Sequence, residues 1–491
     1  MQGQKIFFLS VLTGLHELTK FWSYKSMKTQ TRKNLNIQSM LRSLLPYFAK
    51  IEDPRKTKNI SLQDIIMSGL AVFQLKIPAL QLLDDYRHEP LAHPNLKRLF
   101  EIQKIPSDTQ LRDVLDRIPT DKFRLPFDII FRTLQQDKAL EQFKFYDGTK
   151  DQYLVATDAT GVFGSTNIKC DYCLAKMQRN QGEDGEELFY HHQLLAATIV
   201  HPDRQTVIPL CPEPIIQQDG KAKNDCELAA AERLYFNIRQ SHPKLPMVLL
   251  QDSLFANTTN IARLQKYDLG FIIVAKSDRN KNLFRAMEQR RSSLKDVFDF
   301  ERVITIGDKV KKIMTRKYSY VNDVPLTGEL ETSVNLLCFK ETIEWTTQTG
   351  RKKGEVQRTE VNYAWITGIH LDNSNIEKIA QAGRTRWDVE NGVFNILKNH
   401  GYRLEHNYGH GKQFLANNFA MLAMLAFLID QVQEAHCDLF QEVIKRWKNS
   451  KSRIWKFLDV VISLQSFNSW FDLWSSLAKS GQKANRTLDG C

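Results

Sequence analysis

The sequence predicts an α/β fold in which buried strands alternate with amphipathic helices around a mixed sheet. Short apolar runs with the composition of buried strands occur at residues 154–156, 193–200, 206–210, 247–250 and 271–275. Residues 225–239 and 257–266 have helical patterns and lie between these runs. Strands that alternate with helices are typical of a mixed α/β sheet.

Residues 35–145, which precede the first strand, are predicted to be all helical. Ser61 is a candidate N-cap, and Ser107 with Gln110 three residues later fits a capping box. The helix after Ser107 has one apolar face and one charged face with basic residues. Such helices suit DNA binding, and they also suit any helical bundle.

The amino-acid composition changes again beyond the apolar run at residues 271–275. Residues 298–370 are rich in β-forming residues and include a basic loop tip at residues 351–353. The predicted divisions are an extended or disordered start (1–30), a helical DNA-binding domain (31–148), the first part of a catalytic core (149–297), a β-rich insertion (298–370), core helices (371–430) and a helical C-terminal region rich in basic and aromatic residues (431–491).

Composition bounds the class of protein. The 491 residues include 68 Lys and Arg against 56 Asp and Glu, a net charge of +12 that favours a polyanionic partner. A basic but unspecialised protein has the same composition. Seven scattered cysteines do not form the pattern of a disulfide framework, so we expect a reducing, cytoplasmic location. The apolar run 414–429 contains Asn417 and Asn418 and is shorter than a bilayer span, so no membrane segment is expected.

Three acidic residues are the candidate catalytic groups. Asp158 follows the apolar run at 153–157, Asp252 follows residues 247–251, and Glu390 lies on a helix-like stretch. Carboxylates are the ligands that Mg²⁺ prefers, and two Mg²⁺ or Mn²⁺ ions held this way can cleave a phosphodiester. For either aspartate alone, a turn or capping role is at least as common.

The segments 156–160, 251–256 and 386–390 resemble the three catalytic segments of DDE transposases of the insertion-sequence type. They are most similar to the insertion-sequence family numbered four, in which a β domain precedes the catalytic glutamate. The resemblance covers roughly residues 105–430. It implies a ribonuclease-H-like core, with Asp158, Asp252 and Glu390 as ligands of two Mg²⁺ or Mn²⁺ ions.

The resemblance extends to two basic residues. Arg386 matches the signature arginine that grips DNA phosphate, and Lys398 stands near the signature lysine. Gly383 occupies the position of the signature tyrosine, and Lys398 follows Glu390 by eight residues where the family has seven. A salt bridge from Arg386 to Asp388 or Glu390 and a solvated position for Lys398 are the structural alternatives.

The resemblance implies a cut-and-paste DNA transposase. It would bind the inverted repeats of double-stranded DNA, cleave with Mg²⁺-activated water and join the 3′-hydroxyl ends to target DNA. Synapsis of two ends predicts a homodimer on DNA. A ribonuclease-H-like nuclease and a non-catalytic DNA-binding descendant of a transposase are the alternatives.

A CxxC pair suggests a second kind of chemistry. Cys170 and Cys173 precede His191 and His192 by about twenty residues. A structural zinc site would use both thiols and a histidine, but one CxxC supplies only two of four ligands, so no zinc is predicted. The glycine-rich segment around His410 is either a local turn or a contact with the active site or DNA.

Several aromatic residues have two readings. Trp345 is a candidate platform for a flipped DNA base, although a core position is favoured. Phe467, Trp470, Phe471 and Trp474 repeat at helical spacing and predict an apolar face, packed in the core or against another protomer.

Overall fold

The computed structural model describes residues 34–179, 185–216, 227–293, 297–306, 312–326, 331–347 and 354–483. The start predicted to be extended, residues 1–30, and the basic loop tip at 351–353 lie outside these ranges.

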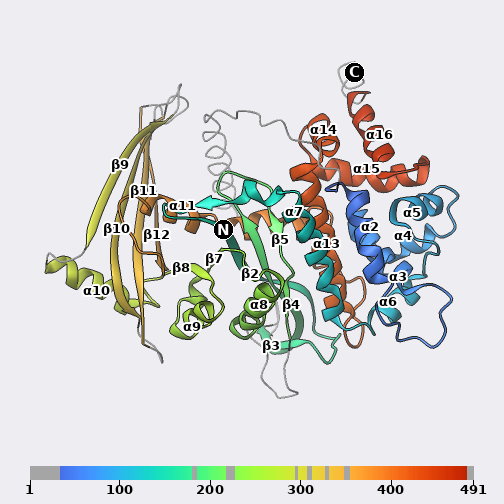
Figure 1. The fold of residues 1–491 in the computed structure, drawn as a ribbon, viewed down its shortest axis with the longest axis horizontal. Coiled ribbons are helices and arrows are strands. Elements are labelled where there is room, and N and C mark those ends of the chain that lie inside the picture. Colours follow the sequence, from blue (N-terminus) through green and yellow to red (C-terminus); the bar gives the residue numbers. More distant parts are fainter. Residues whose placement is uncertain are drawn as a thin grey trace.

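A mixed sheet organises the described part of the chain, so the predicted mixed α/β class is confirmed (Figure 1). The strand order is β3-β4-β2-β7-β8-β12-β11-β10-β9, with β1 beside β2 and with β5 and β6 beside β4. The strands are β1 (Phe145–Tyr146), β2 (Asp151–Ser165), β3 (Leu174–Arg179), β4 (Glu186–Val200), β5 (Ile208–Pro209), β6 (Glu213–Ile215), β7 (Met247–Gln251), β8 (Gly270–Val274), β9 (Phe298–Ile306), β10 (Lys312–Leu326), β11 (Thr332–Thr346) and β12 (Val356–Thr367).

The centre of the sheet combines both strand directions. β2 pairs antiparallel with β4 and parallel with β7, and β7 pairs parallel with β8. All five residues of β7 are buried. Because successive side chains of a strand point to opposite faces, this strand is covered on both sides, as its unbroken apolar sequence predicts.

The β-rich region after residue 298 continues this sheet. β12 pairs antiparallel with β8, with Trp365 opposite Val274, and β11, β10 and β9 follow outward (Figure 1, left). Away from the core, β11 alternates buried and partly buried side chains, and β12 alternates exposed and partly buried ones. The region is therefore an antiparallel extension of the core sheet.

Helices form the rest of the structure. The described helices are α2 (Ile37–Phe48), α3 (Leu62–Gln74), α4 (Leu80–Asp85), α5 (Ala92–Phe100), α6 (Asp108–Leu115), α7 (Leu125–Gln136), α8 (Glu227–Ser241), α9 (Thr258–Lys266), α10 (Lys281–Ser292), α11 (Ile376–Arg384), α12 (Asn395–Asn399), α13 (Leu415–His436), α14 (Asp438–Arg446), α15 (Lys451–Leu464) and α16 (Trp470–Lys483), with short helical turns η1 (Thr120–Phe123), η2 (Ala139–Phe143), η3 (Ser253–Phe255) and η4 (Val389–Phe394). The predicted caps are confirmed: the Oγ atoms of Ser61 and Ser107 accept hydrogen bonds from the amides of Asp64 and Gln110 at 3.0 and 3.2 Å.

The helices before and after the sheet pack into one helical body (Figure 1, right). Asn418 on α13 donates hydrogen bonds to the carbonyls of Leu115 and Ile118 at 2.8 and 2.7 Å. The indole of Trp470 on α16 donates to the Leu99 carbonyl at 2.9 Å. Segments predicted as separate N-terminal and C-terminal regions therefore share one apolar core.

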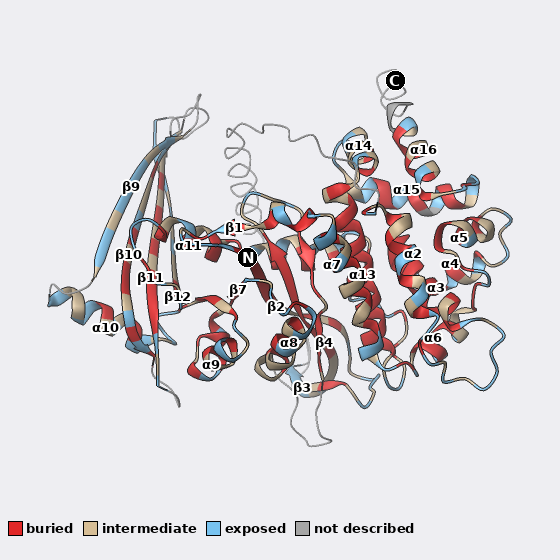
Figure 2. Cartoon of the chain, in the orientation of Figure 1, coloured by how far each residue is buried: buried red, intermediate tan, exposed pale blue. Residues whose placement is uncertain are grey.

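α13 is the axis of this body. Among the described residues it is the one helix long and apolar enough to cross a membrane, and its apolar window is entirely buried inside the protein. Figure 2 shows α13 and β4 largely buried, whereas much of β9 is exposed. α13 is thus explained as a core helix. Trp470 and Trp474 are also core residues, whereas Phe471 is 67% exposed.

Candidate active site

Asp158 lies inside β2. The sequence predicted that the strand ends before Asp158, but β2 continues to Ser165 with Asp158 opposite Ala196 of β4. The strand extends because the later residues of β2 pair with the long antiparallel strand β4. The carboxylate is partly exposed, and its Oδ1 accepts the Ala159 amide at 2.9 Å.

Asp252 leaves the neighbouring strand at the same edge of the sheet. Ala156 of β2 is in register with Leu250 of β7, so Asp158 and Asp252 each follow that pair by two residues. Oδ1 of Asp252 accepts the Leu254 amide at 2.9 Å and caps η3. Parallel pairing thus brings the two aspartates to equivalent positions along adjacent strands.

A buried polar network holds the two strands behind the aspartates. Gln251 donates hydrogen bonds to Thr157 Oγ1 and to the Tyr235 hydroxyl at 3.2 and 2.8 Å. Asn260 donates to Gln251 Oε1 at 3.1 Å and accepts from Tyr235 at 2.9 Å. Each aspartate is the next residue after a member of this network, so α8 and α9 fix the positions of both.

Glu390 comes from a segment much later in the chain and approaches Asp158 through Arg386. It lies in η4, a short π-helical segment. Such segments are rare and occur frequently at functional sites. Arg386 joins Glu390 to Asp158: its Nη2 lies 3.0 Å from Glu390 Oε1, and its Nη1 lies 3.1 Å from Asp158 Oδ2. The Arg386 side chain is 9% exposed, so this guanidinium is a nearly buried cation between two carboxylates.

The pKa of Asp158 reflects this setting. Burial raises the pKa of Asp158 to about 6, the positive charge of Arg386 opposes that rise, and the carboxylate of Glu390 adds to it. Burial also raises the pKa of Asp388 to about 7. Asp158 and Glu390 are therefore costly to ionise together, a feature common at functional sites, whereas the shift at Asp388 reflects burial alone.

Glu227 is a fourth acidic residue of the site, and the sequence analysis did not single it out. It begins α8. Burial raises the pKa of Glu227, and the negative charges of Asp158 and Asp252 raise it further. Its position at the start of a predicted helix, near Asp225, was the available signal. Asp225 itself lies outside the described residues.

The structure also shows the surroundings of two residues at the signature positions. Lys398 lies on α12, where its Nζ pairs with Glu405 Oε1 at 2.6 Å. At Gly383 an added Cβ would lie 2.5 Å from the indole of Trp365. The buried Trp365 ring therefore fills the space that a larger residue at position 383 would need, which explains the glycine.

The donor set fits a hard divalent cation. Asp158, Asp252, Glu390 and Glu227 offer carboxylate oxygens, the ligands that Mg²⁺ and Mn²⁺ prefer. Asp158 and Glu390 already share one cationic partner, Arg386, whose Nε is buried without a hydrogen-bond partner. The geometry can thus hold positive charge between the two carboxylates.

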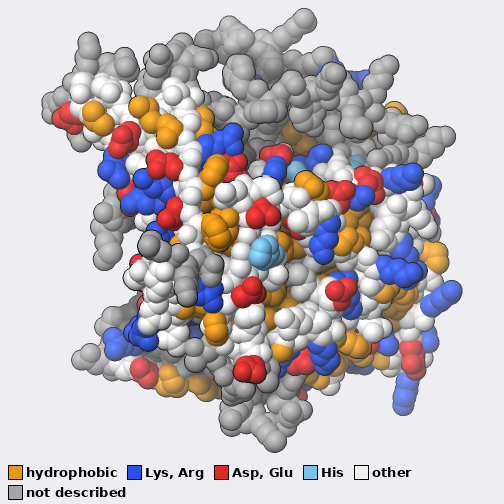
Figure 3. All heavy atoms as spheres, turned by 60° about the vertical axis from the view of Figure 1, so that its left-hand side comes forward, with side chains coloured by type: hydrophobic (Ala, Val, Ile, Leu, Met, Phe, Trp, Pro, Cys, Tyr) orange, Lys and Arg blue, Asp and Glu red, His pale blue; other side chains and the backbone are white. Residues whose placement is uncertain are grey.

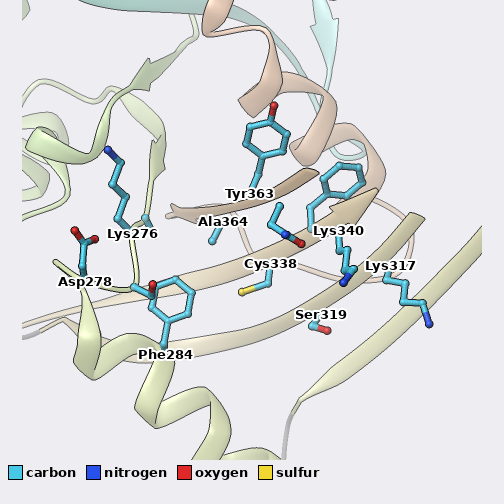
Figure 4. Close-up of a pocket in the computed structure, with 13 residues that line it drawn as sticks. Lys276, Asp278, Phe284, Lys317, Ser319, Cys338, Lys340, Tyr363 and Ala364 are labelled. Atoms are coloured by element: carbon cyan, nitrogen blue, oxygen red, sulfur yellow. The ribbon is translucent and has the colours of Figure 1, made fainter. Parts of the chain in front are cut away.

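A groove whose lining includes three lysines and Asp278 lies on the sheet extension. It has a volume of about 550 Å³ and opens between α10 and the face of the extended sheet (Figure 4). Its lining includes Lys276, Lys317 and Lys340, and Lys276 follows β8 at the edge where Asp252 follows β7. Glu301 pairs with Lys317 at 3.1 Å and Glu360 with Lys340 at 2.6 Å. On the face drawn in Figure 3, basic side chains likewise alternate with acidic ones.

Comparison with models of known protein families found no match, and a search of curated proteins found no match either.

Proposed function

We propose that this protein is a metal-dependent DNA transposase, which cleaves DNA at the ends of an element and joins the resulting 3′-hydroxyls to target DNA. The observation that carries the proposal is the convergence of Asp158, Asp252 and Glu390 on one edge of a mixed sheet. These residues lie on three separate segments of the chain, and they match the three segments whose resemblance to DDE transposases is described above.

The strand order supports a ribonuclease-H-like core. β4, β2, β7 and β8 are adjacent in that order, with β4 antiparallel to β2 and with β7 and β8 parallel to it. β6 pairs with the outer side of β4. An antiparallel strand pair beside two parallel strands is the arrangement expected of that core, and the sheet extension precedes Glu390 in the chain, as the β insertion would.

In the proposed reaction the carboxylates bind divalent ions. Mg²⁺ or Mn²⁺, when bound, would stabilise the attacking and leaving oxygens of the phosphodiester. Asp158 would be shared, with Asp252 and Glu390 completing the sites and Glu227 close enough to assist. Arg386 would retain one carboxylate while it balances negative charge from the phosphate, because a guanidinium can donate in two directions at once.

Three features support DNA as the substrate. Trp387 follows Arg386, is 48% exposed and has its ring 5.5 Å from the Arg386 guanidinium, so it can stack on an unpaired base beside the carboxylates. Lys276, which lines the groove, is exposed and follows β8, the strand next to β7. The net charge of +12 favours the same partner.

The test is nicking of supercoiled plasmid DNA that carries the sequences flanking the gene. Wild-type protein with Mg²⁺ should nick this DNA, whereas Asp158→Asn and Asp252→Asn should reduce the rate roughly a hundredfold or more. Asp151→Asn is the matched control, because Asp151 is an exposed carboxylate at the start of the same strand β2. Equal loss in all three variants, or full activity in Asp252→Asn, would remove the assignment.

Joined products separate a transposase from its alternatives. Strand transfer into a second plasmid supports the proposal, while nicking without joining identifies a nuclease. DNA binding without nicking identifies a non-catalytic descendant. The proposal includes a homodimer on DNA, because two ends must be held together, and the mass of the protein–DNA complex tests it.

A further inference from the structure

We propose that Cys170, Cys173, His192 and His410 bind one Zn²⁺ ion in a tetrahedral site. One potential ligand atom from each residue lies within 4.8 Å of all the others. Two thiols and two imidazoles form a soft donor set that suits zinc and differs from the oxygen donors of the candidate active site.

The distances match those that zinc imposes. With Zn–S near 2.3 Å and Zn–N near 2.0 Å, tetrahedral geometry requires about 3.8 Å between sulfurs and about 3.5 Å between sulfur and nitrogen. The Sγ atoms of Cys170 and Cys173 are 3.7 Å apart. Nε2 of His192 lies 3.4 and 3.5 Å from these sulfurs, and Nε2 of His410 lies 3.2 Å from Cys173 Sγ.

The site is buried and its rings are oriented towards the sulfurs. Cys173 is 5% exposed, His192 is fully buried and His410 is 6% exposed. In both histidines Nδ1 is buried without a hydrogen-bond partner, while Nε2 faces the thiols. Packing of the His410 ring against Phe163 (centroids 4.7 Å apart) and against His192 (5.0 Å) sets these orientations.

The Cys170–Cys173 loop is shaped like a metal-binding turn. The amide of Cys170 donates to Cys173 Sγ at 3.3 Å, which favours the thiolate that a metal requires. The amide of Cys173 donates to the Cys170 carbonyl at 3.2 Å and closes the turn. The CxxC spacing therefore presents both sulfurs on one side of the loop.

The loop that carries His410 is equally fixed. Gly409 and Gly411 have φ angles of +130° and +71°, and a Cβ at either would lie 2.5 Å or less from Arg112 or Asp116. The Asp116 carboxylate also accepts the amides of residues 412–415 at 2.9 to 3.0 Å, which caps the start of α13. His410 is thus held on a loop anchored to α6.

The proposed zinc links two parts of the candidate active site. Cys170 and Cys173 follow β2, the strand of Asp158, and His192 lies on β4. His410 follows the segment that carries Glu390, at a sequence separation of 237 residues from Cys173. A metal bond across so long a loop would restrict the relative motion of β2 and the Glu390 segment. This role is structural and separate from the proposed DNA chemistry.

The first experiment measures metal in the full-length protein purified without added metal. We expect about one zinc ion per chain by elemental analysis. Cys173→Ser and His410→Asn should lose it, whereas His191→Asn should keep it. His191 is the matched control because it precedes His192 on β4 and its side chain points to the opposite face. Zinc retained by Cys173→Ser, or lost from His191→Asn, would overturn the assignment.

Co²⁺ spectroscopy tests the site in wild-type protein, so a folding failure of a variant cannot hide the answer. Exchange with Co²⁺ should give the visible absorption of tetrahedral cobalt with thiolate ligands, and added Zn²⁺ should abolish it. A wild-type protein that holds no zinc and shows no such band contradicts the proposal. A Cys170–Cys173 disulfide found by mass mapping in freshly purified protein contradicts it as well.

Discussion

At the scale of single residues, Arg386 makes the contact that matters most. The sequence predicted either a DNA contact or a salt bridge with Asp388 or Glu390, and the structure shows the bridge to Glu390 together with one to Asp158. The second bridge joins residues 228 positions apart, so no local pattern could reveal it. The role of Arg386 in gripping DNA stays a prediction.

We predict that Arg386→Gln destabilises the protein and makes it more responsive to Mg²⁺. Without the guanidinium, Asp158 and Glu390 face each other unpaired, which should cost about 1–3 kcal/mol, since Glu390 is partly exposed. Bound Mg²⁺ can replace the lost positive charge. Thermal unfolding with excess Mg²⁺ or with EDTA measures this, and the rise in Tm with Mg²⁺ should be larger in the variant than in wild type.

Arg384→Gln is the control for that experiment. Arg384 lies two residues before Arg386. Its guanidinium pairs with Glu341 at 3.2 Å and not with Asp158 or Glu390. Its loss should leave the Mg²⁺ response at the wild-type level. An identical rise in Tm with Mg²⁺ in all three proteins would mean that Mg²⁺ does not bind where the Arg386 guanidinium lies.

His242 should make stability depend on pH. Burial, together with the positive charge of Arg239, lowers the pKa of His242 from 6.5 to about 4, and the centroid of its ring lies 4.1 Å from that of Phe131. Between these pH values the unfolded chain binds more protons than the folded one. Stability therefore falls as the pH drops from 6.5 towards 4, by on the order of 2–3 kcal/mol.

Urea denaturation at several pH values across that window tests the assignment. His242→Leu keeps an apolar side chain against Phe131 and removes the titrating group. Its unfolding free energy should decline less steeply with falling pH than that of wild type. Parallel curves for the two proteins would assign the pH dependence to other groups.

At the scale of elements, apolar runs located the central strands but not their ends. Residues 247–250 predicted β7 to within one residue, because a strand covered on both faces is apolar throughout. Residues 154–156 predicted only part of the first half of β2, because its later residues are less uniformly buried and are held in the strand by pairing with β4. Where side chains alternate between core and solvent, the partner strand determines how far pairing extends.

Two glycines of the Glu390 region should respond oppositely to alanine. At Gly383 a Cβ would meet the Trp365 ring at 2.5 Å, so Gly383→Ala should destabilise by about 1–3 kcal/mol. At Gly392, within η4, nothing lies within 4 Å of the added Cβ, so Gly392→Ala should stabilise by about 0.5–1 kcal/mol. Chemical denaturation of both variants checks the pair, and a loss of stability in Gly392→Ala would show that η4 needs its glycine.

At the scale of the whole molecule, changes in composition along the chain predicted separate regions, but side chains from several of these regions pack into one core. The N-terminal helices and the C-terminal helices read as separate regions because hundreds of residues intervene. In the structure they enclose α13, and the sheet extension continues the core sheet through β8 and β12. Contacts between distant segments leave no periodic signal in either segment, so the shared core could not be predicted.

The buried pair of Lys76 and Asp430 connects these parts. Lys76 Nζ lies 2.7 Å from Asp430 Oδ2, with both side chains under 5% exposed. Gln74 and the Tyr402 hydroxyl also donate to Asp430, and Lys76 Nζ lies 4.5 Å from the ring centroid of Trp455. The ion pair and its neighbours thus connect four elements, which are the helices α3, α13 and α15 and the segment that follows α12.

We therefore predict that Asp430→Ala weakens the whole molecule. It leaves the Lys76 ammonium buried without its counter-charge, at a cost of about 3–5 kcal/mol. Glu442→Ala, which removes an exposed partner of Arg446, should cost under about 1 kcal/mol. If the helical body and the sheet form one cooperative unit, far-ultraviolet circular dichroism and tryptophan fluorescence should give one coincident, shifted transition in Asp430→Ala. Two separated transitions, with only one displaced, would show instead that the N-terminal helices unfold as an independent domain, as the sequence divisions predict.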